Sequence, residues 1–385
     1  MLKVYFHMYL AREEEPKLFQ MLEWKEALAL IGPRRAGKTT LALRLLEDWK
    51  AEGGKGVYFD MEALGAPATA RDLLSEINKV PRKGMVILDE VQVLTDWVKI
   101  VRAEVENGKR NMIVTGSSAT LLSGEIASSL GGRAIPETIL PLSFRDAKRW
   151  GDFSLKEYLE IGGYPECVLR PSAAKKLHKL YLELTVLRDV AARKKLREVK
   201  PLSDLALLLL SEPGKSVSAK KTSGRLGISQ PTFRSFVHAF NDAFLILSIP
   251  PYLRSPRKRI VADAKHYAYD TGLQASVSIS AEKDEGRRLE NLVAIELARR
   301  GYSLSYFTTG SGECDFIAQK AGEETLAVQV WGGEGKVPQR EWDGLRSGMR
   351  GTGAKGLFLS LDKIGEKPGV KETTVKTIEK WMLEG

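Results

Sequence analysis

The segment that most constrains this chain spans residues 28–46 and contains the pattern G-x-x-x-x-G-K-[ST]. The pattern lies between an apolar, strand-like run and a run with the apolar periodicity of a helix. Its glycines let the backbone turn tightly, so that successive N–H groups converge on a phosphate at the positive end of a helix. The segment therefore predicts a phosphate-binding loop, made of Gly32, Pro33, Arg34, Arg35, Ala36, Gly37, Lys38, Thr39 and Thr40.

Four residues have predicted roles in the chemistry at this loop. In this motif Lys38 reaches the β- and γ-phosphates of a nucleotide, and the Thr39 hydroxyl holds Mg²⁺. Residues 85–90 form a short apolar run that ends in two acids, the pattern of a buried parallel strand that brings carboxylates to the ligand-binding edge of a sheet. Asp89 is predicted to bind Mg²⁺, largely through water, and Glu90 to polarise the attacking water as general base. The second acid favours a hydrolase over a nucleotide-binding switch.

Two further residues are weaker candidates for the same site. A third apolar strand ends in Gly116 and Ser117, and Ser117 is predicted to contact the γ-phosphate or the attacking water. A strand that runs into a Gly-Ser turn is common without any such role, so both interpretations stay open. Arg133 lies in a Gly-Gly-Arg loop before the last expected strand and is our first candidate for the arginine that stabilises transition-state charge, with Arg188 and Arg145 behind it. A surface arginine that caps a loop is the alternative.

Composition indicates a protein with room for two or three domains. The chain has 385 residues, of which 43% are hydrophobic, enough for substantial cores. Cys167 and Cys314 are too few for a metal cluster or a disulfide framework, which favours a reduced, cytoplasmic setting. The four histidines show no metal-ligand spacing. We expect no membrane contact, because no apolar run is long enough to span a bilayer and the N-terminus lacks the pattern of a signal peptide.

The charge of the chain favours an anionic partner. The formal net charge is +10, so nucleic acid, and DNA in particular, is the first candidate. Basic residues cluster in segments 188–200, 215–225 and 254–259. Solvated helix faces and loops would give the same clusters. Charge alone therefore leaves both interpretations open.

The chain resembles a known family at several motifs. These are the phosphate-binding loop, the two strand ends, and the segments GGR at 131–133, PLSFR at 141–145 and GGYPE at 162–166. Together they resemble the archaeal and bacterial AAA-type ATPases that carry a C-terminal region of unknown function like DUF4143. The resemblance implies ATP as the nucleotide and Mg²⁺ as its metal. It also implies an ATPase core that is followed by a winged helix and a fold similar to restriction endonucleases.

The order of expected elements agrees with an α/β fold. Strands alternate with helices in the first part of the chain, which predicts a parallel sheet covered on both faces. Strands are expected near residues 57–60, 86–89, 112–115 and 134–140, and a helix at 10–24. The predicted domains are a P-loop ATPase core at 1–145, a helical lid at 146–202, a winged helix-turn-helix at 203–258 and a small, degenerate restriction-endonuclease-like α/β domain at 259–385.

Residues 222–237 have the pattern of a helix-turn-helix. Gly227 supplies the turn, Ser229 is the expected N-cap, and Pro231 suits the first helical turn. In such a module the second helix can enter the major groove of DNA. The side chains that it would present are those of Gln230, Thr232, Arg234 and Ser235. Winged helices also serve as protein-interaction and packing modules, so DNA binding by this helix is one of two open roles.

The C-terminal part carries an incomplete nuclease pattern. Glu290 on a helix, and Asp315 before the strand 326–331, are similar to the core of PD-(D/E)xK nucleases. Gln329 and Trp331 stand where that pattern needs an acid and a lysine. A neutral amide is a poor replacement for a carboxylate that holds a metal, and tryptophan cannot act as the cation.

Neighbouring residues do not complete this pattern in the sequence. Glu313 could substitute for the missing acid. It lies two residues before Asp315, and residues two apart on a strand point to the same face. No lysine is available, since Lys320 lies beyond Asp315 towards the hairpin turn. We therefore expect no nuclease activity, and a structural or nucleic-acid-docking role for this domain.

Two function classes follow from the sequence. The first is a Mg²⁺-dependent ATPase that couples hydrolysis to DNA binding or remodelling through the winged helix and the basic surface. The second is a nucleotide-controlled interaction or assembly switch that binds no DNA. Stimulation of hydrolysis by DNA separates the two. Homo-oligomerisation is compatible with both.

Overall fold

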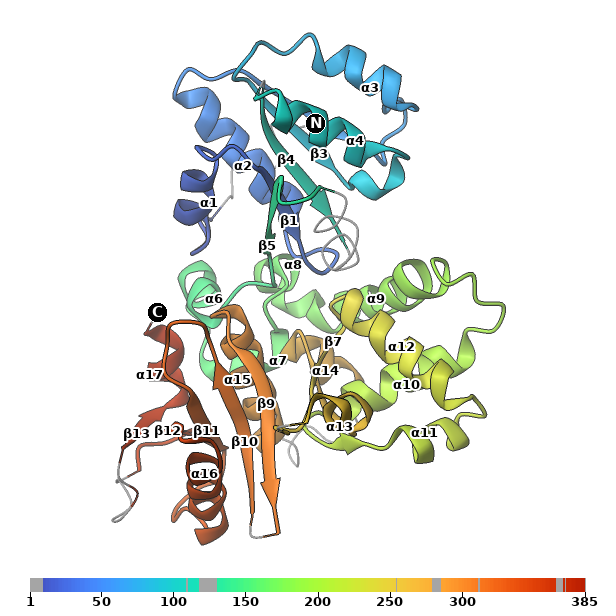
Figure 1. Cartoon of the computed structure of the whole chain (residues 1–385). Helices are drawn as coiled ribbons and strands as arrows, with labels where there is room; N and C mark the ends of the chain where they lie inside the picture. Colours follow the sequence, from blue (N-terminus) through green and yellow to red (C-terminus); the bar gives the residue numbers. More distant parts are fainter. Residues whose placement is uncertain are drawn as a thin grey trace. The chain divides into compact units, whose positions relative to one another are not determined.

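The structure is a computed structural model that describes residues 10–108, 110–117, 130–253, 255–278, 285–310, 312–364, 370 and 372–384. The chain divides into two compact units (Figure 1). Unit 1 comprises Met1–Leu142 and Asp242–Phe244, and unit 2 comprises Ser143–Asn241 and Leu245–Gly385. The finer division into four domains stays a prediction.

Unit 1 is built on one parallel sheet. Its five strands run in the order β2-β3-β4-β1-β5, and each neighbouring pair is parallel. The predicted α/β fold with a parallel sheet is thereby confirmed. The strands are β1 (Ala27–Ile31), β2 (Gly56–Asp60), β3 (Met85–Asp89), β4 (Asn111–Gly116) and β5 (Ala134–Thr138).

Helices cover both faces of this sheet, as the apolar runs in its strands require. Along β1, Leu28 and Leu30 pack in one core cluster with α1 (Glu15–Met21) and α2 (Lys38–Ala51). The intervening Ala27 and Ala29 pack in a second cluster, with α3 (Ala70–Ile77) and α4 (Trp97–Glu106). The short 3₁₀-helix η3 (Val91–Val93) follows β3. Alternate side chains of a strand point to opposite faces, so both sides of β1 are buried.

One element of unit 1 is shorter than expected. The helix predicted at 10–24 is only Glu15–Met21. Arg12 lies before it and is buried, with its guanidinium bonded to backbone carbonyls of distant segments. A tertiary contact therefore replaces the first turn that the periodicity predicted.

Unit 2 begins with a series of helices whose starts are capped. Ser143 accepts a hydrogen bond from the backbone N–H of Asp146 at the start of α6, and Ser154 and Glu157 form a capping box at α7. These side chains satisfy N–H groups that a helix start leaves free. The elements are α6 (Phe144–Gly151), α7 (Leu155–Ile161), α8 (Pro165–Leu169), η5 (Pro171–Ala173), α9 (Ala174–Leu184), the π-helix η6 (Thr185–Ala191) and α10 (Lys200–Ser211).

The GGYPE segment has a packing role in unit 2. Gly162 has φ +67°, and a Cβ there would lie 2.2 Å from Oδ1 of Asp270. The buried Asp270 carboxylate accepts hydrogen bonds from Gly163 N at 2.7 Å and from Leu273 N at 2.9 Å. Asp270 thus caps α14 (Thr271–Val277) and joins it to the turn after α7. Only glycine fits position 162.

The middle of unit 2 combines short helices with a small antiparallel sheet. The sheet has the order β6-β8-β7. Its strands and the neighbouring helices are β6 (Ser216–Val217), α11 (Ala219–Arg225), α12 (Gln230–Asp242), β7 (Ile246–Ile249), α13 (Pro256–Val261) and β8 (Ala264–Ala268). The predicted turn and cap are present, because Gly227 has φ +66° and Ser229 Oγ accepts from Thr232 N at 3.1 Å.

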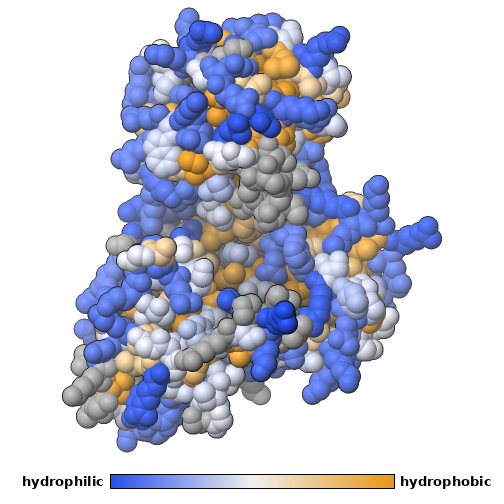
Figure 2. Space-filling model, viewed as in Figure 1, coloured by the Kyte–Doolittle hydropathy of each residue, from blue (hydrophilic) through white to orange (hydrophobic). Residues whose placement is uncertain are grey.

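The end of unit 2 is a five-stranded mixed sheet with helices. Its order is β13-β12-β11-β10-β9, antiparallel from β9 to β11 and parallel from β11 to β13. The elements are α15 (Glu285–Arg299), β9 (Ser303–Thr309), β10 (Gly312–Gln319), β11 (Leu326–Trp331), α16 (Gln339–Thr352), β12 (Lys355–Ser360), β13 (Thr373–Thr377) and α17 (Ile378–Leu383). Figure 2 shows a largely hydrophilic surface on the visible face of each unit, broken by smaller apolar patches. Within the described residues, no helix combines the length and the apolar character that crossing a membrane requires.

Candidate functional site

The candidate site lies at the C-terminal edge of the parallel sheet in unit 1. Strands β3, β4 and β1 are neighbours and run in the same direction, so their C-terminal ends lie together. The phosphate-binding loop follows β1, Asp89 ends β3, and Ser117 follows β4. The strand order reverses at β1, which is the position where open α/β sheets bind ligands. The structure thus brings together the three elements that the sequence predicted as one site.

Glycine geometry shapes the loop itself. Gly32 has φ +146°, and a Cβ there would lie 2.1 Å from the carbonyl oxygen of Ile139. Gly37 has φ +92° and directly precedes α2. A side chain at position 32 would collide with the backbone after β5, and one at either position would be strained. The two fixed glycines of the motif are therefore both required by the fold.

Lys38 is held inside the loop that it is predicted to serve. Its side chain is buried, and Nζ donates to the carbonyl oxygens of Gly32 at 3.0 Å and Pro33 at 2.9 Å. Arg34 lies 3.9 Å from Glu62, and Arg35 is exposed. The buried ammonium, together with N–H groups at the start of α2, makes this edge attractive to anions.

Three hydroxyl groups converge on the buried carboxylate of Asp89. Thr39 Oγ1 lies 3.0 Å from Oδ1 and 2.9 Å from Oδ2, and the Tyr58 hydroxyl donates to Oδ2 at 2.8 Å. Thr115 Oγ1 also donates to Oδ1. Burial, followed by the charge of Asp89, raises the pKa of Tyr58 well above its ordinary value. Tyr58 therefore stays a hydrogen-bond donor.

Glu90 adopts a backbone conformation that is unusual for its residue type. Its φ is +54° and its ψ +50°, and its N–H donates to Thr115 Oγ1 at 3.1 Å. Its carboxylate accepts a hydrogen bond from the amide of Gln92. A non-glycine residue in this region costs about 1 kcal/mol or more, and such outliers concentrate at functional sites.

Ser117 has a buried hydroxyl at the same edge. The residue is fully buried, and Oγ has no hydrogen-bond partner among the described residues. A buried polar atom without a partner is costly unless a ligand or water completes it. The position agrees with a sensor role for Ser117, which stays a prediction.

The structure does not bring Arg133 to the loop. Its carbonyl accepts from the N–H of Ala27, the first residue of β1, whereas the loop follows the last residue of that strand. Arg133 therefore lies at the opposite edge of the sheet, where it contacts Glu106 at 2.7 Å. Within one chain it cannot approach a phosphate in the loop. The other two candidates, Arg145 and Arg188, belong to unit 2.

Two residues at the site were not predicted from the sequence. Tyr58 lies on β2, and Thr115 is near the end of β4. Both could have been found from one signal, since each carries a hydroxyl group within a mostly apolar strand of the same sheet. Both contact Asp89 because of the order of the strands in the sheet. Neither segment encodes that order.

The residues at the edge fit a nucleotide-bound Mg²⁺ ion. Mg²⁺ commonly takes one or two protein ligands and completes its shell with phosphate oxygens and water. Thr39 and Asp89 supply one hydroxyl and one carboxylate in contact with each other. No group of three or more His, Cys, Asp or Glu side chains in the described part of the chain is arranged to hold a metal by itself.

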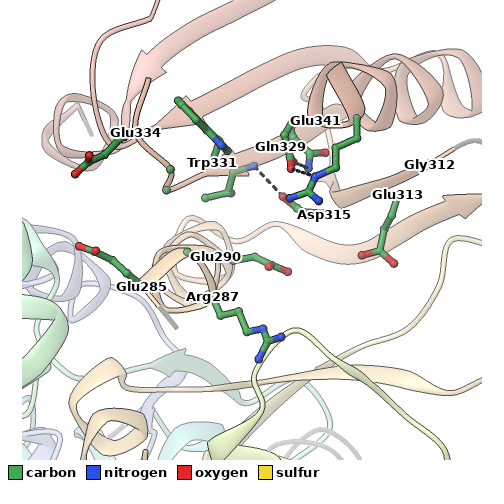
Figure 3. A pocket seen from close by; sticks show the side chains of 15 residues that line it. Glu285, Arg287, Glu290, Gly312, Glu313, Asp315, Gln329, Trp331, Glu334 and Glu341 are labelled. Atoms are coloured by element: carbon green, nitrogen blue, oxygen red, sulfur yellow. Dashed lines mark hydrogen bonds and ion pairs between the residues drawn. The ribbon is translucent and has the colours of Figure 1, made fainter. Parts of the chain in front are cut away.

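A second cavity, in unit 2, contains the incomplete nuclease pattern. It has a volume of about 910 Å³, and its walls come from α15, β10, β11 and α16. Figure 3 shows Glu290 on α15 across from Asp315 on β10, with Glu313 further along the same strand. Asp315 accepts from Val330 N at 2.8 Å, and Gln329 donates to Glu341 at 2.9 Å.

The expectation that no lysine is available in this cavity region was wrong. Lys265, on β8, is buried, and its Nζ lies 2.6 Å from Glu313 and 3.5 Å from Glu290. Burial lowers the pKa of Lys265, but the nearby carboxylates raise it, with the net result above its ordinary value. Burial, and then the charge of Glu290, raises the pKa of Asp315 well above its ordinary value. Packing of β8 beside α15 and β10 brings in a lysine that lies 50 residues earlier in the chain than Asp315, a contact that no local pattern reveals.

The side chains predicted to face DNA lie along α12. Gln230 and Arg234 are exposed, and Thr232 and Ser235 are half-buried. Lys194 Nζ donates to Ser235 Oγ at 2.8 Å, which places a further basic residue beside this face. The opposite face of α12 is apolar and buried through Phe233, Phe236 and Phe240.

Comparisons with known proteins identify two domains. Residues 25–148 match a family described as an AAA domain, and residues 152–284 match a domain of unknown function, DUF8612, where the resemblance had implied a region like DUF4143. An uncharacterized protein of Haemophilus influenzae is 31% identical over 343 residues, which are 82% of this chain and 86% of that protein. An uncharacterized protein of Methanocaldococcus jannaschii is 31% identical over 332 residues, 78% of this chain and 73% of that one. Among solved structures, the Aeropyrum pernix ORC1 protein in complex with DNA is similar at 13% identity and a TM-score of 0.30, over 70% of this chain and 92% of that chain.

Proposed function

This chain belongs to a family of AAA-domain proteins with uncharacterized relatives in bacteria and archaea, and on that premise we propose that it is an ATPase that uses Mg²⁺. The observation that carries the proposal is the contact between Thr39 and Asp89 at the sheet edge, beside a buried Lys38. This arrangement combines an anion-binding loop with a hydroxyl and a carboxylate that suit Mg²⁺.

Each residue of the edge has a distinct part in the proposed reaction. Lys38 and the N–H groups at the start of α2 bind and orient the phosphates. Thr39 and Asp89 hold the Mg²⁺ ion, which when bound neutralises charge on the phosphate oxygens. Glu90 accepts the proton of the attacking water as general base, and Gln92 orients its carboxylate. Ser117, whose hydroxyl has no partner among the residues that the structure describes, donates to a phosphate oxygen or to that water.

Two substitutions test the ATPase proposal because they remove different steps. Lys38→Ala should lose ATP binding and lower turnover by about 10² to 10³-fold, the usual cost of one electrostatic contact to the reacting group. Glu90→Gln should keep ATP affinity and lose about 10² to 10⁴-fold in turnover, because only the proton acceptor is removed. Titration of ATP and single-turnover rates with Mg²⁺ measure both. Equal loss of affinity in the two variants would show that Glu90 is not the base.

We propose further that α10, α11, α12 and the β6-β8-β7 sheet form a winged helix that binds DNA and couples to hydrolysis. Support comes from the helix order, the small antiparallel sheet, and an exposed basic face. Lys220, Lys221 and Arg225 on α11 are exposed, as is Arg234 on α12. Such residues contact phosphates without regard to sequence. The mixed sheet after it is proposed to be a degenerate relative of the restriction-endonuclease fold.

Salt dependence tests the DNA proposal. Replacement of Lys220, Lys221, Arg225 or Arg234 by glutamine should weaken duplex binding across sequences and reduce the slope of log affinity against log salt by about one unit per contact. ATP turnover without DNA should stay unchanged, and turnover of the wild type should rise with DNA. A matched control is Lys99→Gln, an exposed lysine on α4 of unit 1. If the wild type binds no duplex or single-stranded DNA at low salt, the chain is instead a nucleotide-controlled interaction protein.

A further inference from the structure

Arg12 is a buried arginine that touches the phosphate-binding loop from outside it. Its side chain is 3% exposed. Nη1 donates to the carbonyl oxygen of Ala36 at 2.8 Å, and Nη2 donates to the carbonyl oxygen of Leu140 at 2.7 Å. Ala36 is inside the loop, 24 residues along the chain, and Leu140 follows β5, 128 residues along. One guanidinium therefore joins two segments that are remote in sequence.

The charge of Arg12 is already balanced by the protein. Nε lies 3.3 Å from one oxygen of Glu14, and Nη2 lies 3.4 Å from the other. The guanidinium thus makes four contacts with protein acceptors, two with backbone carbonyls and two with the Glu14 carboxylate. This arrangement suits a group that holds the loop in place, and it does not suit one that binds a phosphate directly.

The contact with Ala36 determines the direction of an N–H group in the loop. A trans peptide unit is planar, so its carbonyl and its N–H point in opposite directions. Arg12 fixes the carbonyl of Ala36, and it therefore also orients the N–H of Gly37, in the next residue. Gly37 directly precedes α2 and has φ +92°. This N–H is one of those by which such a loop binds a phosphate.

The contact with Leu140 lies in a segment that meets the loop a second time. Ile139, the neighbour of Leu140, donates its N–H to Ile31 at 2.6 Å, and its carbonyl oxygen faces Gly32 so closely that only glycine fits. Residues 139–140 therefore touch the start of the loop directly and its middle through Arg12. The same segment runs into unit 2, which begins at Ser143.

We propose that Arg12 is a positioning residue that holds the phosphate-binding loop in its binding conformation and couples it to the segment that leads into unit 2. The proposal rests on the ATPase function proposed above. A nucleotide bound in the loop restricts the motion of the Ala36–Gly37 peptide. Because Arg12 bonds to both Ala36 and Leu140, the motion of residues 139–140 is then restricted as well. Because a planar fork of donors reaches both carbonyls at once, lysine cannot replace it fully.

The test compares Arg12→Met and Arg12→Lys with the wild-type full-length chain. Methionine keeps much of the apolar stem and removes every donor. ATP affinity is measured by titration, melting temperature is measured without nucleotide, and amide hydrogen exchange is followed in the loop and in residues 139–146. In the wild type, saturating ATP should protect both segments. Arg12→Met should bind ATP about 10-fold to 100-fold more weakly, as expected when hydrogen bonds from a charged donor are lost.

Hydrogen exchange distinguishes positioning from simple stability. At saturating ATP the loop of Arg12→Met should be protected while residues 139–146 are not, and Arg12→Lys should fall between it and the wild type. Arg44→Met is the matched control, because Arg44 pairs with Asp48 on the exposed side of α2, and it should behave like the wild type. If both Arg12 variants melt lower but keep wild-type affinity and protection of residues 139–146, Arg12 is only structural. A wild type that binds no ATP overturns the ATPase proposal as well.

Discussion

At the residue scale, the site depends on a few side chains that form hydrogen bonds with Asp89. Asp89 receives hydroxyl donors from α2, β2 and β4, so its carboxylate is oriented before any ligand binds. Such preorganisation lowers the cost of assembling the site around a ligand. Glu90 stores backbone strain, while the buried hydroxyl of Ser117 has no hydrogen-bond partner in the part of the chain that the structure describes. A ligand or water that bonds to the Ser117 hydroxyl would remove its cost, and backbone outliers such as Glu90 concentrate at functional sites.

Arg133 gives a prediction at this scale because its position excludes contact with a phosphate bound in the loop of its own chain. We expect Arg133→Ala to keep turnover within about two-fold of the wild type, since an essential arginine would cost about 10³-fold or more. The contact with Glu106 is half-exposed on both sides, so the melting temperature should change little. Steady-state turnover measures the first effect and thermal unfolding the second.

Action of Arg133 on a neighbouring copy is tested by mixing variants. Equal amounts of Arg133→Ala and Lys38→Ala should show no more activity than the Arg133→Ala protein alone. A large loss in Arg133→Ala, with activity recovered in the mixture, would show that Arg133 acts on the loop of a neighbouring copy.

At the element scale, the three-stranded sheet of unit 2 contains a buried histidine. His266 on β8 is 3% exposed, and its Nδ1 lies 2.8 Å from the hydroxyl of Ser248 on β7. Burial lowers the pKa of His266 to about 4. Between about pH 6.5 and pH 4, the folded chain therefore keeps this side chain neutral.

This histidine predicts a pH dependence of stability. Below about pH 6.5 the unfolded chain binds a proton at His266 that the folded chain does not, so stability falls as pH drops from about 6.5 towards 4. The full loss is about 3 kcal/mol for a shift of this size. Urea unfolding at pH 7 and pH 4.5, followed by a signal from unit 2, measures it. His266→Asn, whose side-chain oxygen can replace Nδ1 as a partner of Ser248, should weaken the dependence, and His238→Asn on the exposed face of α12 should not.

At the scale of the whole molecule, the two units are suited to different chemistry. Unit 1 places a lysine, a hydroxyl and a carboxylate around one loop. Unit 2 surrounds Lys265 with carboxylates, so that the protein itself supplies the cation at that place. A carboxylate cluster that an internal lysine already neutralises has less attraction for a divalent ion. We therefore propose metal-dependent nucleotide chemistry for unit 1 and not for the Lys265 cluster of unit 2.

The corresponding prediction is that the purified protein does not cut nucleic acid. With Mg²⁺ or Mn²⁺, plasmid, single-stranded and branched DNA should stay intact, because Gln329 donates to Glu341 where a metal-binding acid would be needed. Gel electrophoresis over a range of metal concentrations measures nicking. Residual cleavage that is equal in Asp315→Ala comes from a contaminant. Cleavage that disappears in Asp315→Ala would show that Lys265 and the remaining carboxylates form an active site.

The sequence by itself determined the loop, the strand end at Asp89 and Glu90, and the parallel sheet. These features follow from local patterns, and the rule that parallel strands end at one edge brings them together. The same rule would have placed Arg133 correctly, because a residue just before a parallel strand lies at the opposite edge from one just after it. The helix at 10–24 was predicted too long, since periodicity cannot show that Arg12 is drawn into the core.

Only the tertiary structure decided which distant residues complete these sites. Tyr58 reaches Asp89 because β2 pairs with β3, Arg12 reaches Leu140 across 128 residues, and Lys265 reaches Glu313 because β8 lies near β10. Each contact depends on strand order and on burial that the whole chain creates. A local pattern records the conformation of its own segment, whereas the partner of a buried charge or hydroxyl is set by the packing of segments that share no sequence neighbourhood.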